Sequence, residues 1–146
     1  MSEQMPGLPG PRPDATTEGY WTAAGRGELV VQRCSACGVH RHPPTEVCYV
    51  CSSLDWSWEP HSGDGTVYSY TWVERPIVPA LAALGAYNTT VVELDDTKGV
   101  VRILSRVTDV ARDALAVGLP VEVHFDPAGD GVALPVFRPR AQGGGS

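Results

Sequence analysis

The chain has 146 residues, with 17 acidic against 11 basic side chains and a formal net charge of −6 at pH 7. This length suits one ordinary domain, or a small module joined to a modest one. The acidic balance argues against bulk electrostatic binding to DNA, RNA or an anionic membrane, and no apolar run approaches the length of a membrane span. We therefore expect a protein of the reducing cytoplasm that has neither nucleic acid nor a membrane as its partner.

The composition divides the chain into four parts. Residues 1–15 are rich in Pro and Gly and poor in core-forming side chains, so we expect a disordered tail, and residues 141–146 should form a flexible end. Between these tails we expect a helix plus a metal-binding ribbon over residues 16–60. Residues 61–140 should form a separate β domain.

The first helix is expected to begin at a threonine cap, either Thr16 or Thr17, and to end at one of the glycines of residues 25–27. It would carry Tyr20 and Trp21. A short strand over residues 28–32 should then lead into the first cysteine pair.

The cysteines form two pairs, Cys34-x-x-Cys37 and Cys48-x-x-Cys51, and the chain has no others. Each pair places two thiolates on a tight knuckle, and a short hairpin between the pairs would bring four sulfurs to one point, as tetrahedral Zn²⁺ requires. We therefore predict one zinc ion. Four thiolate ligands leave no open position for water or substrate, so this zinc would be structural rather than catalytic.

Two alternatives to zinc remain open at this point. One is a disulfide framework, although no cysteine lies outside the cluster to staple the rest of the chain. The other is iron in a rubredoxin-like site, because a tetrahedron of four cysteines accepts either metal. The basic residues beside the ligands are expected to offset the thiolate charge or to lie in solvent at the hairpin tip. They are Arg33, His40, Arg41 and His42.

After the second cysteine pair the pattern becomes almost purely β. We predict five strands, with a helix over residues 109–117 between the third and the fourth. The strands are expected over residues 66–74, 87–94, 100–107, 120–125 and 132–138. A helical break at this place is typical of an OB-fold, a small Greek-key barrel, and we prefer this fold to a generic five-strand sandwich fragment. The predicted fold class is thus mainly β.

The aromatic residues of the first of these strands need separate consideration. Tyr68, Tyr70 and Trp72 occupy alternate positions and so should share one face of the strand. Exposed aromatics on an OB-fold can stack on bases, but packing within the barrel is the preferred interpretation. No histidine or serine of the chain stands in a spacing typical of a catalytic site, so we expect no catalytic residue.

The segment over residues 76–86 joins the first two barrel strands and lacks any charged side chain. Such an apolar loop is either buried as a short helix on the barrel or covered by another chain. If a partner covers it, the expected contact residues are Ile77, Val78, Leu81 and Leu84. Trp21 of the N-terminal helix is the second choice for a contact.

Several features together resemble a known family, the zinc-ribbon plus OB-fold proteins associated with acyl-CoA chemistry. They are the Tyr20-Trp21 pair, residues 29–38 (LVVQRCSACG), the Pro43-Pro44 pair, the second cysteine pair, residues 65–73 (GTVYSYTWV), residues 118–121 (GLPV) and residues 134–139 (LPVFRP). The resemblance covers roughly residues 19–139. It implies an N-terminal helical hairpin and a rubredoxin-like ribbon followed by an OB-fold, with Cys34, Cys37, Cys48 and Cys51 as the metal ligands.

The same resemblance implies a function beside a thiolase-fold enzyme. The chain would be a non-catalytic accessory or scaffold subunit, with a lipid-transfer-protein-like aldolase of steroid side-chain degradation as the expected partner. The first alternative is a stand-alone module that binds acyl-CoA. A binder of single-stranded nucleic acid and a rubredoxin-like electron carrier are further alternatives, and the acidic charge opposes the former.

Overall fold

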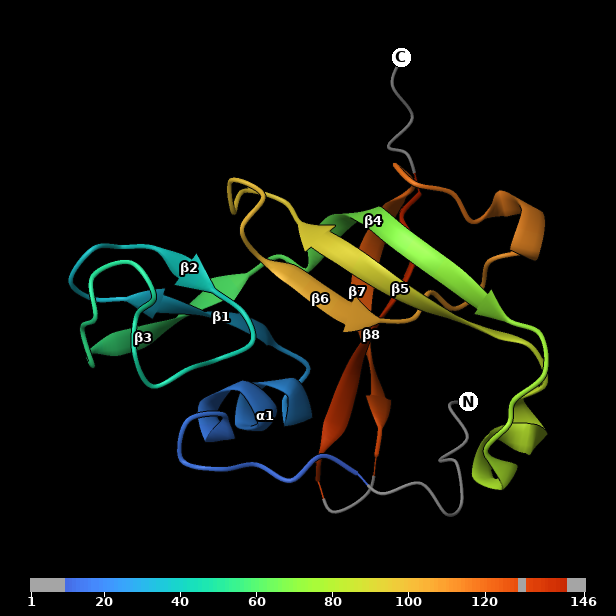
Figure 1. Cartoon of the computed structure of the whole chain (residues 1–146), viewed down its shortest axis with the longest axis horizontal. Helices are drawn as coiled ribbons and strands as arrows, with labels where there is room; N and C mark the ends of the chain where they lie inside the picture. Colours follow the sequence, from blue (N-terminus) through green and yellow to red (C-terminus); the bar gives the residue numbers. More distant parts are fainter. Residues whose placement is uncertain (1–9, 129–130, 142–146) are drawn as a thin grey trace.

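The computed structural model describes residues 10–128 and 131–141. These residues form one α-helix and eight β-strands, and the strands make two sheets (Figure 1). The predicted tails lie largely outside the described residues. No helix in this part of the chain is both long and apolar enough to cross a membrane. The architecture is a helix and a small ribbon followed by a curled five-stranded sheet, which confirms the predicted fold class.

Helix α1 (Glu18–Gly25) is preceded by a turn that Asp14 holds. One oxygen of this carboxylate accepts hydrogen bonds from the backbone N–H groups of Thr16 (3.0 Å) and Thr17 (2.9 Å) and from the Thr17 hydroxyl (2.9 Å). Thr17 therefore occupies the cap position, but its side chain bonds Asp14 and not the helix. The resemblance implied a helical hairpin, whereas the described residues contain this single α-helix.

The ribbon is a three-stranded antiparallel sheet in the order β2-β1-β3. Its strands are β1 (Leu29–Cys34), β2 (His40–Arg41) and β3 (Trp56–His61). The central strand β1 begins one residue later than predicted and runs on to the first metal ligand, because β3 pairs along its whole length. The first four residues of β1 are buried, which shows that both faces of the strand are covered there.

The second sheet has the antiparallel order β6-β5-β4-β7-β8. Its strands are β4 (Asp64–Val73), β5 (Tyr87–Leu94), β6 (Arg102–Ser105), β7 (Pro120–Pro127) and β8 (Ala133–Pro139). A parallel bridge between Val107 and Phe137 joins the two edges, so the sheet curls into the partly open barrel of an OB-fold.

One buried polar network fixes this closure. The side chain of Asn88 donates to the Val107 carbonyl (2.8 Å) and accepts from the Val107 N–H (2.9 Å). The Thr90 hydroxyl donates to the same amide oxygen (2.7 Å). Each partner is satisfied, so the network positions the end of β6 without the cost of an unpaired polar group.

The predicted helix over residues 109–117 is wrong. The structure has only a short 3-10 turn, Arg112–Ala114, flanked by extended residues. Asp109 has a positive φ of 54°, which stops a right-handed helix at its start. Leu115 is 3% exposed and packs in the core, so tertiary contact of this side chain overrides the local helical spacing.

The prediction that the three aromatic residues of β4 share one face is also wrong. The pairing of β4 with β5 shifts register between Val67 and Ser69, so Tyr68 is an extra residue in a β-bulge. Tyr70 pairs with Thr90 of β5, and Trp72 pairs with Asn88. Both aromatic side chains therefore lie on the same face of the sheet as these two buried residues. Tyr68 instead packs under the guanidinium of Arg102, 3.9 Å from the ring centre.

The two sheets share one hydrophobic core. Phe137, Val92 and Val121 are fully buried in the barrel, and the same cluster includes Tyr20 of α1 and Leu29 of β1. The helix and ribbon are thus held against the barrel, and the surface between them forms part of the functional site.

Candidate functional site

The cysteine cluster lies at the end of the ribbon remote from the barrel. The four sulfurs lie within 4.8 Å of one another, with Cys34 to Cys51 and Cys37 to Cys48 both at 3.6 Å. A disulfide would bring two sulfurs to about 2.05 Å, so neither pair is bonded. Zn–S bonds of about 2.3 Å place tetrahedral ligand atoms about 3.8 Å apart. The observed cluster therefore fits a closed four-thiolate zinc centre.

Backbone hydrogen bonds favour the thiolate form of the two buried ligands. The N–H of Cys37 lies 3.5 Å from Cys34 Sγ and lowers the pKa of that thiol to about 6. The N–H of Cys51 is the largest cause of the lowered pKa of Cys48. Thiolates are the form that binds zinc, and a filled tetrahedral shell leaves no position for water, so the metal would hold the ribbon together without taking part in a reaction.

The two knuckles have matching backbone geometry. Gly38 and Ser52 each follow the second cysteine of a pair, and both have positive φ angles, 79° and 62°. Their N–H groups donate to the carbonyls of Cys34 (3.0 Å) and Cys48 (2.9 Å). The left-handed conformation costs a serine more than a glycine, so the second knuckle keeps its shape against a local preference.

The expectation for the residues beside the ligands is only half right. Arg33 and His40 lie at the surface and both bond Glu59, at 3.2 and 3.1 Å. The hydrogen bond from His40 lowers the pKa of that glutamate. Arg41, in contrast, is 3% exposed, donates to the Thr45 carbonyl and lies over the Trp56 ring.

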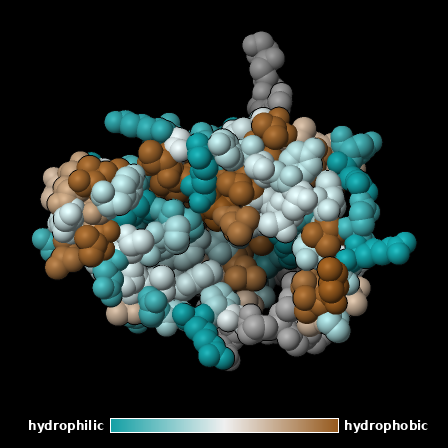
Figure 2. Space-filling view, in the orientation of Figure 1, coloured by the Kyte–Doolittle hydropathy of each residue, from teal (hydrophilic) through white to brown (hydrophobic). Residues whose placement is uncertain are grey.

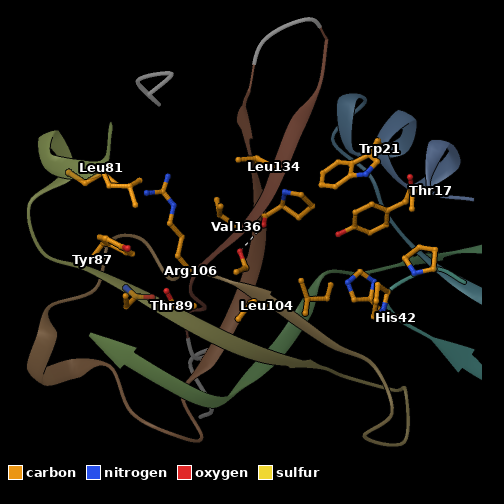
Figure 3. Close-up of a pocket in the computed structure, with 18 residues that line it drawn as sticks. Thr17, Trp21, His42, Leu81, Tyr87, Thr89, Leu104, Arg106, Leu134 and Val136 are labelled. Carbon is orange, nitrogen blue, oxygen red and sulfur yellow. Dashed lines mark hydrogen bonds between the residues drawn. The ribbon is translucent and has the colours of Figure 1, made fainter. Parts of the chain in front are cut away.

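His42 likewise does not lie in solvent but in the wall of a groove between the ribbon and the barrel (Figure 3). This apolar groove has a volume of about 470 Å³, which is within the range of ligand sites. One wall comes from α1 and the ribbon, the other from β5, β6 and β8, and the 3-10 helix Pro79–Leu84 closes one end. Its lining residues are Thr17, Tyr20, Trp21, His42, Pro43, Pro44, Leu81, Leu84, Tyr87, Asn88, Thr89, Ile103, Leu104, Ser105, Arg106, Leu134, Pro135 and Val136.

Some of the polar groups of the apolar groove are engaged with the protein. Among the lining residues that the structure describes, Arg106 alone has a permanent charge, and its guanidinium bonds Asp126 at 2.8 Å. Ser105 donates to the Pro135 carbonyl. Burial lowers the pKa of His42 to about 4, so its ring is neutral at pH 7.

The buried neutral His42 should make stability depend on pH. Between its ordinary pKa of 6.5 and its folded pKa of about 4, the unfolded chain binds a proton that the folded chain does not. The free energy of unfolding therefore falls as the pH drops through this window, by about 2 kcal/mol from pH 7 to pH 5. Urea unfolding of the zinc-loaded protein and of His42→Gln at both pH values tests this. The variant should lose less stability than the parent, and equal losses would contradict the assignment.

The predicted partner-contact residues fall into two groups. Trp21, Leu81 and Leu84 line the apolar groove. Ile77 and Val78, which lie on the same loop as the two leucines, are 95% and 50% exposed. No residue of the 3-10 helix is buried, so the alternative of a loop packed onto the barrel is wrong. Figure 2 shows apolar side chains gathered at the right of the molecule, where this helix lies.

A second exposed apolar area lies on the ribbon, at the left of Figure 2. It surrounds the second zinc knuckle, and we call it the ribbon-tip patch. Its residues are Val47, Tyr49, Val50 and Leu54, which are 46–66% exposed. The sequence patterns did not single out these residues, because short apolar stretches between metal ligands carry no periodicity.

Three arginines of the barrel are each paired with a carboxylate. The pairs are Arg102 with Glu93, Arg106 with Asp126 and Arg138 with Glu122. Neutralised arginines contribute little to phosphate binding.

Comparison with known proteins assigns both parts of the chain. Sequence-family models match residues 21–57 as the ChsH2 rubredoxin-like zinc ribbon domain and residues 58–126 as the ChsH2 C-terminal OB-fold domain. A chain of the structure described as the Ltp2-ChsH2(DUF35) aldolase is 36% identical and superimposes with a TM-score of 0.77, covering 88% of this chain and 98% of that one. The chain belongs to the ChsH2 family. A rubredoxin-like zinc ribbon in this family agrees with the zinc expected at the four cysteines.

Two curated relatives are longer proteins than this chain, and one further solved structure is more distant in sequence. A probable enoyl-CoA hydratase alpha subunit of Thermomonospora curvata is 38% identical over 95% of this chain, which spans 43% of that protein. The 3-oxo-4,17-pregnadiene-20-carboxyl-CoA hydratase alpha subunit of Mycobacterium tuberculosis is 29% identical over 79% of this chain, which spans 35% of it. The chain thus covers less than half of each curated relative. A DUF35 family structure from Sulfolobus solfataricus, 12% identical with a TM-score of 0.61, shows the shared fold alone.

Proposed function

We propose that this chain is a non-catalytic accessory subunit of a thiolase-fold acyl-CoA enzyme, of the lipid-transfer-protein-like aldolase class that acts on steroid side chains. The observation that carries the proposal is the match to the ChsH2 chain of the Ltp2-ChsH2(DUF35) aldolase, which this chain covers almost completely. Two curated relatives are hydratase alpha subunits, but this chain spans less than half of each, so we do not extend the hydratase activity to it.

The chemistry of the described residues supports a role other than catalysis. All four cysteines belong to the metal cluster, so none is free as a nucleophile. In this part of the chain, a hydroxyl next to a histidine occurs at Thr108 and His124, 2.7 Å apart. That hydroxyl also bonds the Phe137 carbonyl, and neither residue lines the apolar groove. Nothing therefore brings a substrate carbonyl to this pair.

The exposed apolar loop over residues 76–86 also supports the accessory role. Ile77 is 95% exposed and Val78 is 50% exposed. The loop that carries them, residues 76–86, has no charged side chain. Exposed apolar clusters of this kind mark interaction sites in soluble proteins. We place the partner on this loop, in a reducing cytoplasm, where the four thiols stay available to zinc.

Co-expression with a thiolase-fold protein encoded beside this chain should yield a stable complex. The two proteins are expected to co-elute in size-exclusion chromatography, and retro-aldol cleavage of an acyl-CoA should require both. The chain alone is the control and should show no cleavage. Separate elution, or full activity of the partner without this chain, would contradict the accessory role.

The apolar groove favours a second candidate, a stand-alone module that binds acyl-CoA. Its volume and lining suit a small apolar ligand. Tight binding of acyl-CoA by the isolated chain, together with failure to associate with any thiolase-fold protein, would favour this second candidate.

A further inference from the structure

The walls of the apolar groove are unusually rigid for a surface of this size. Aromatic and proline side chains dominate its ribbon side, namely Tyr20, Trp21, Pro43 and Pro44, and Pro135 lies on the opposite side. The rings of Tyr20 and Trp21 pack edge to face with centres 5.0 Å apart, which fixes both. Side chains with few rotamers lose little conformational entropy on binding. Flat and fixed walls therefore suit a rigid ring system better than a flexible chain.

The charge of the apolar groove excludes ionic ligands. Arg106 is its one permanently charged residue within the described part of the chain, and Asp126, whose side chain is 14% exposed, already neutralises it at 2.8 Å. A fatty-acid carboxylate or the phosphates of CoA would need an unpaired cation to replace their lost hydration. The ligand part that enters the groove should therefore be neutral.

His42 is one of the polar groups of the groove that remain for a neutral ligand. His40, His61 and His124 each hydrogen-bond a protein group, whereas none of the described residues bonds the His42 ring. A neutral imidazole has one donor and one acceptor nitrogen. Figure 3 shows His42 and Trp21 at one end of the groove and Leu81 and Tyr87 at the other, with Leu104 and Val136 between them. A keto or hydroxyl group at one end of an elongated apolar body would meet this ring.

We propose that the apolar groove binds the neutral fused-ring body of the acyl group, a sterol-sized ligand that bears a keto or hydroxyl group near His42. The identity of that body as part of an acyl-CoA rests on the proposed function, in which the CoA part stays with the partner enzyme. The ring binding itself is a property of this chain, because all lining residues belong to it.

Progesterone, a neutral four-ring ketone, is the probe, and equilibrium dialysis against the isolated zinc-loaded chain is the measurement. We expect a dissociation constant of about 10 µM or tighter, with palmitate and CoA at least about tenfold weaker. Leu104→Glu should weaken progesterone binding by about tenfold or more, because it places a charge in an apolar wall. Leu104 is 69% exposed, so the variant should fold. Val117→Glu, at a residue 67% exposed and outside the groove, is the matched control and should bind as the parent does.

His42→Phe provides a second readout that keeps the apolar wall and removes the hydrogen bond. Its affinity for progesterone should fall several-fold, while its affinity for pyrene, a ring system without oxygen, should stay unchanged. Absence of progesterone binding, tighter binding of palmitate, or an unaffected Leu104→Glu variant would overturn the proposal. Progesterone binding by a chain that forms no complex with a thiolase-fold protein would leave this proposal standing and count against the proposed function instead. The reverse result, a partner complex whose subunit does not bind progesterone, would overturn this proposal alone.

Discussion

Cys48→Ser is expected to release the metal and to unfold the ribbon. Cys48 is 1% exposed, and its sulfur lies 3.6 Å from Cys37 Sγ. Zinc-binding free energies in small zinc domains amount to about 10–16 kcal/mol and act as folding free energy. Loss of one of four ligands should therefore lower the free energy of unfolding by at least about 3 kcal/mol. Metal analysis by mass spectrometry and urea unfolding measure the two effects.

The effect should extend to the apolar groove. His42, Pro43 and Pro44 lie between the two zinc knuckles and line its wall, so the metal holds them in place. The matched control is Ser35→Ala, at an exposed residue within the first knuckle, which should keep one zinc per chain and its stability. Full zinc content and unchanged unfolding of Cys48→Ser would show that the cluster is not a metal centre.

Ile77→Asp is expected to separate the subunits of the proposed complex without harming the chain itself. The side chain is 95% exposed and so contributes nothing measurable to the core. A charge at an apolar interface centre should weaken association by about 2 kcal/mol, which is roughly 30-fold in the dissociation constant. Surface plasmon resonance against the immobilised partner measures the affinity, and an unchanged melting temperature confirms the fold.

Leu54→Asp is the matched control for this experiment. Leu54 is 66% exposed and belongs to the ribbon-tip patch, which lies apart from the 3-10 helix (Figure 1). It should leave the affinity for the partner unchanged. The opposite pattern, a loss with Leu54→Asp and none with Ile77→Asp, would move the docking surface from the loop to the ribbon.

Short-range chemistry made much of this protein predictable. The spacing of the cysteines led to the metal cluster, because a Cys-x-x-Cys pair forms its knuckle from adjacent residues. The bounds of β5 agree with the prediction, and its burial alternates along the strand because one face meets the core and the other does not. The OB-fold was preferred because of a helical break between the third and fourth strands; the closure between Val107 and Phe137 confirms the fold, although only a short 3-10 turn stands at that place.

The errors arose where a distant contact overrode a local pattern. Residues 109–117 have helical spacing, but burial of Leu115 in the core holds them in an extended path. The bulge at Tyr68 depends on the register against β5, which no property of β4 alone specifies. His42 was one of the basic residues expected to offset the thiolate charge or to lie in solvent at the hairpin tip, yet the packing of the ribbon against the barrel partly buries its side chain.

The sequence by itself determined most of the elements and the metal ligands, because spacing and alternation act over a few residues. Only the tertiary structure decided the apolar groove, whose lining runs from Thr17 to Val136 and comes from α1 and the residue before it, the ribbon loop after β2, the 3-10 helix and the barrel sheet. Its neutrality was decided in the same way, since Arg106 and Asp126 lie 20 positions apart and meet only when the sheet curls and brings β7 and β8 toward the end of β6. A concave surface made from five separate chain segments leaves no signal in any of them, because each residue appears as an ordinary position of its own segment.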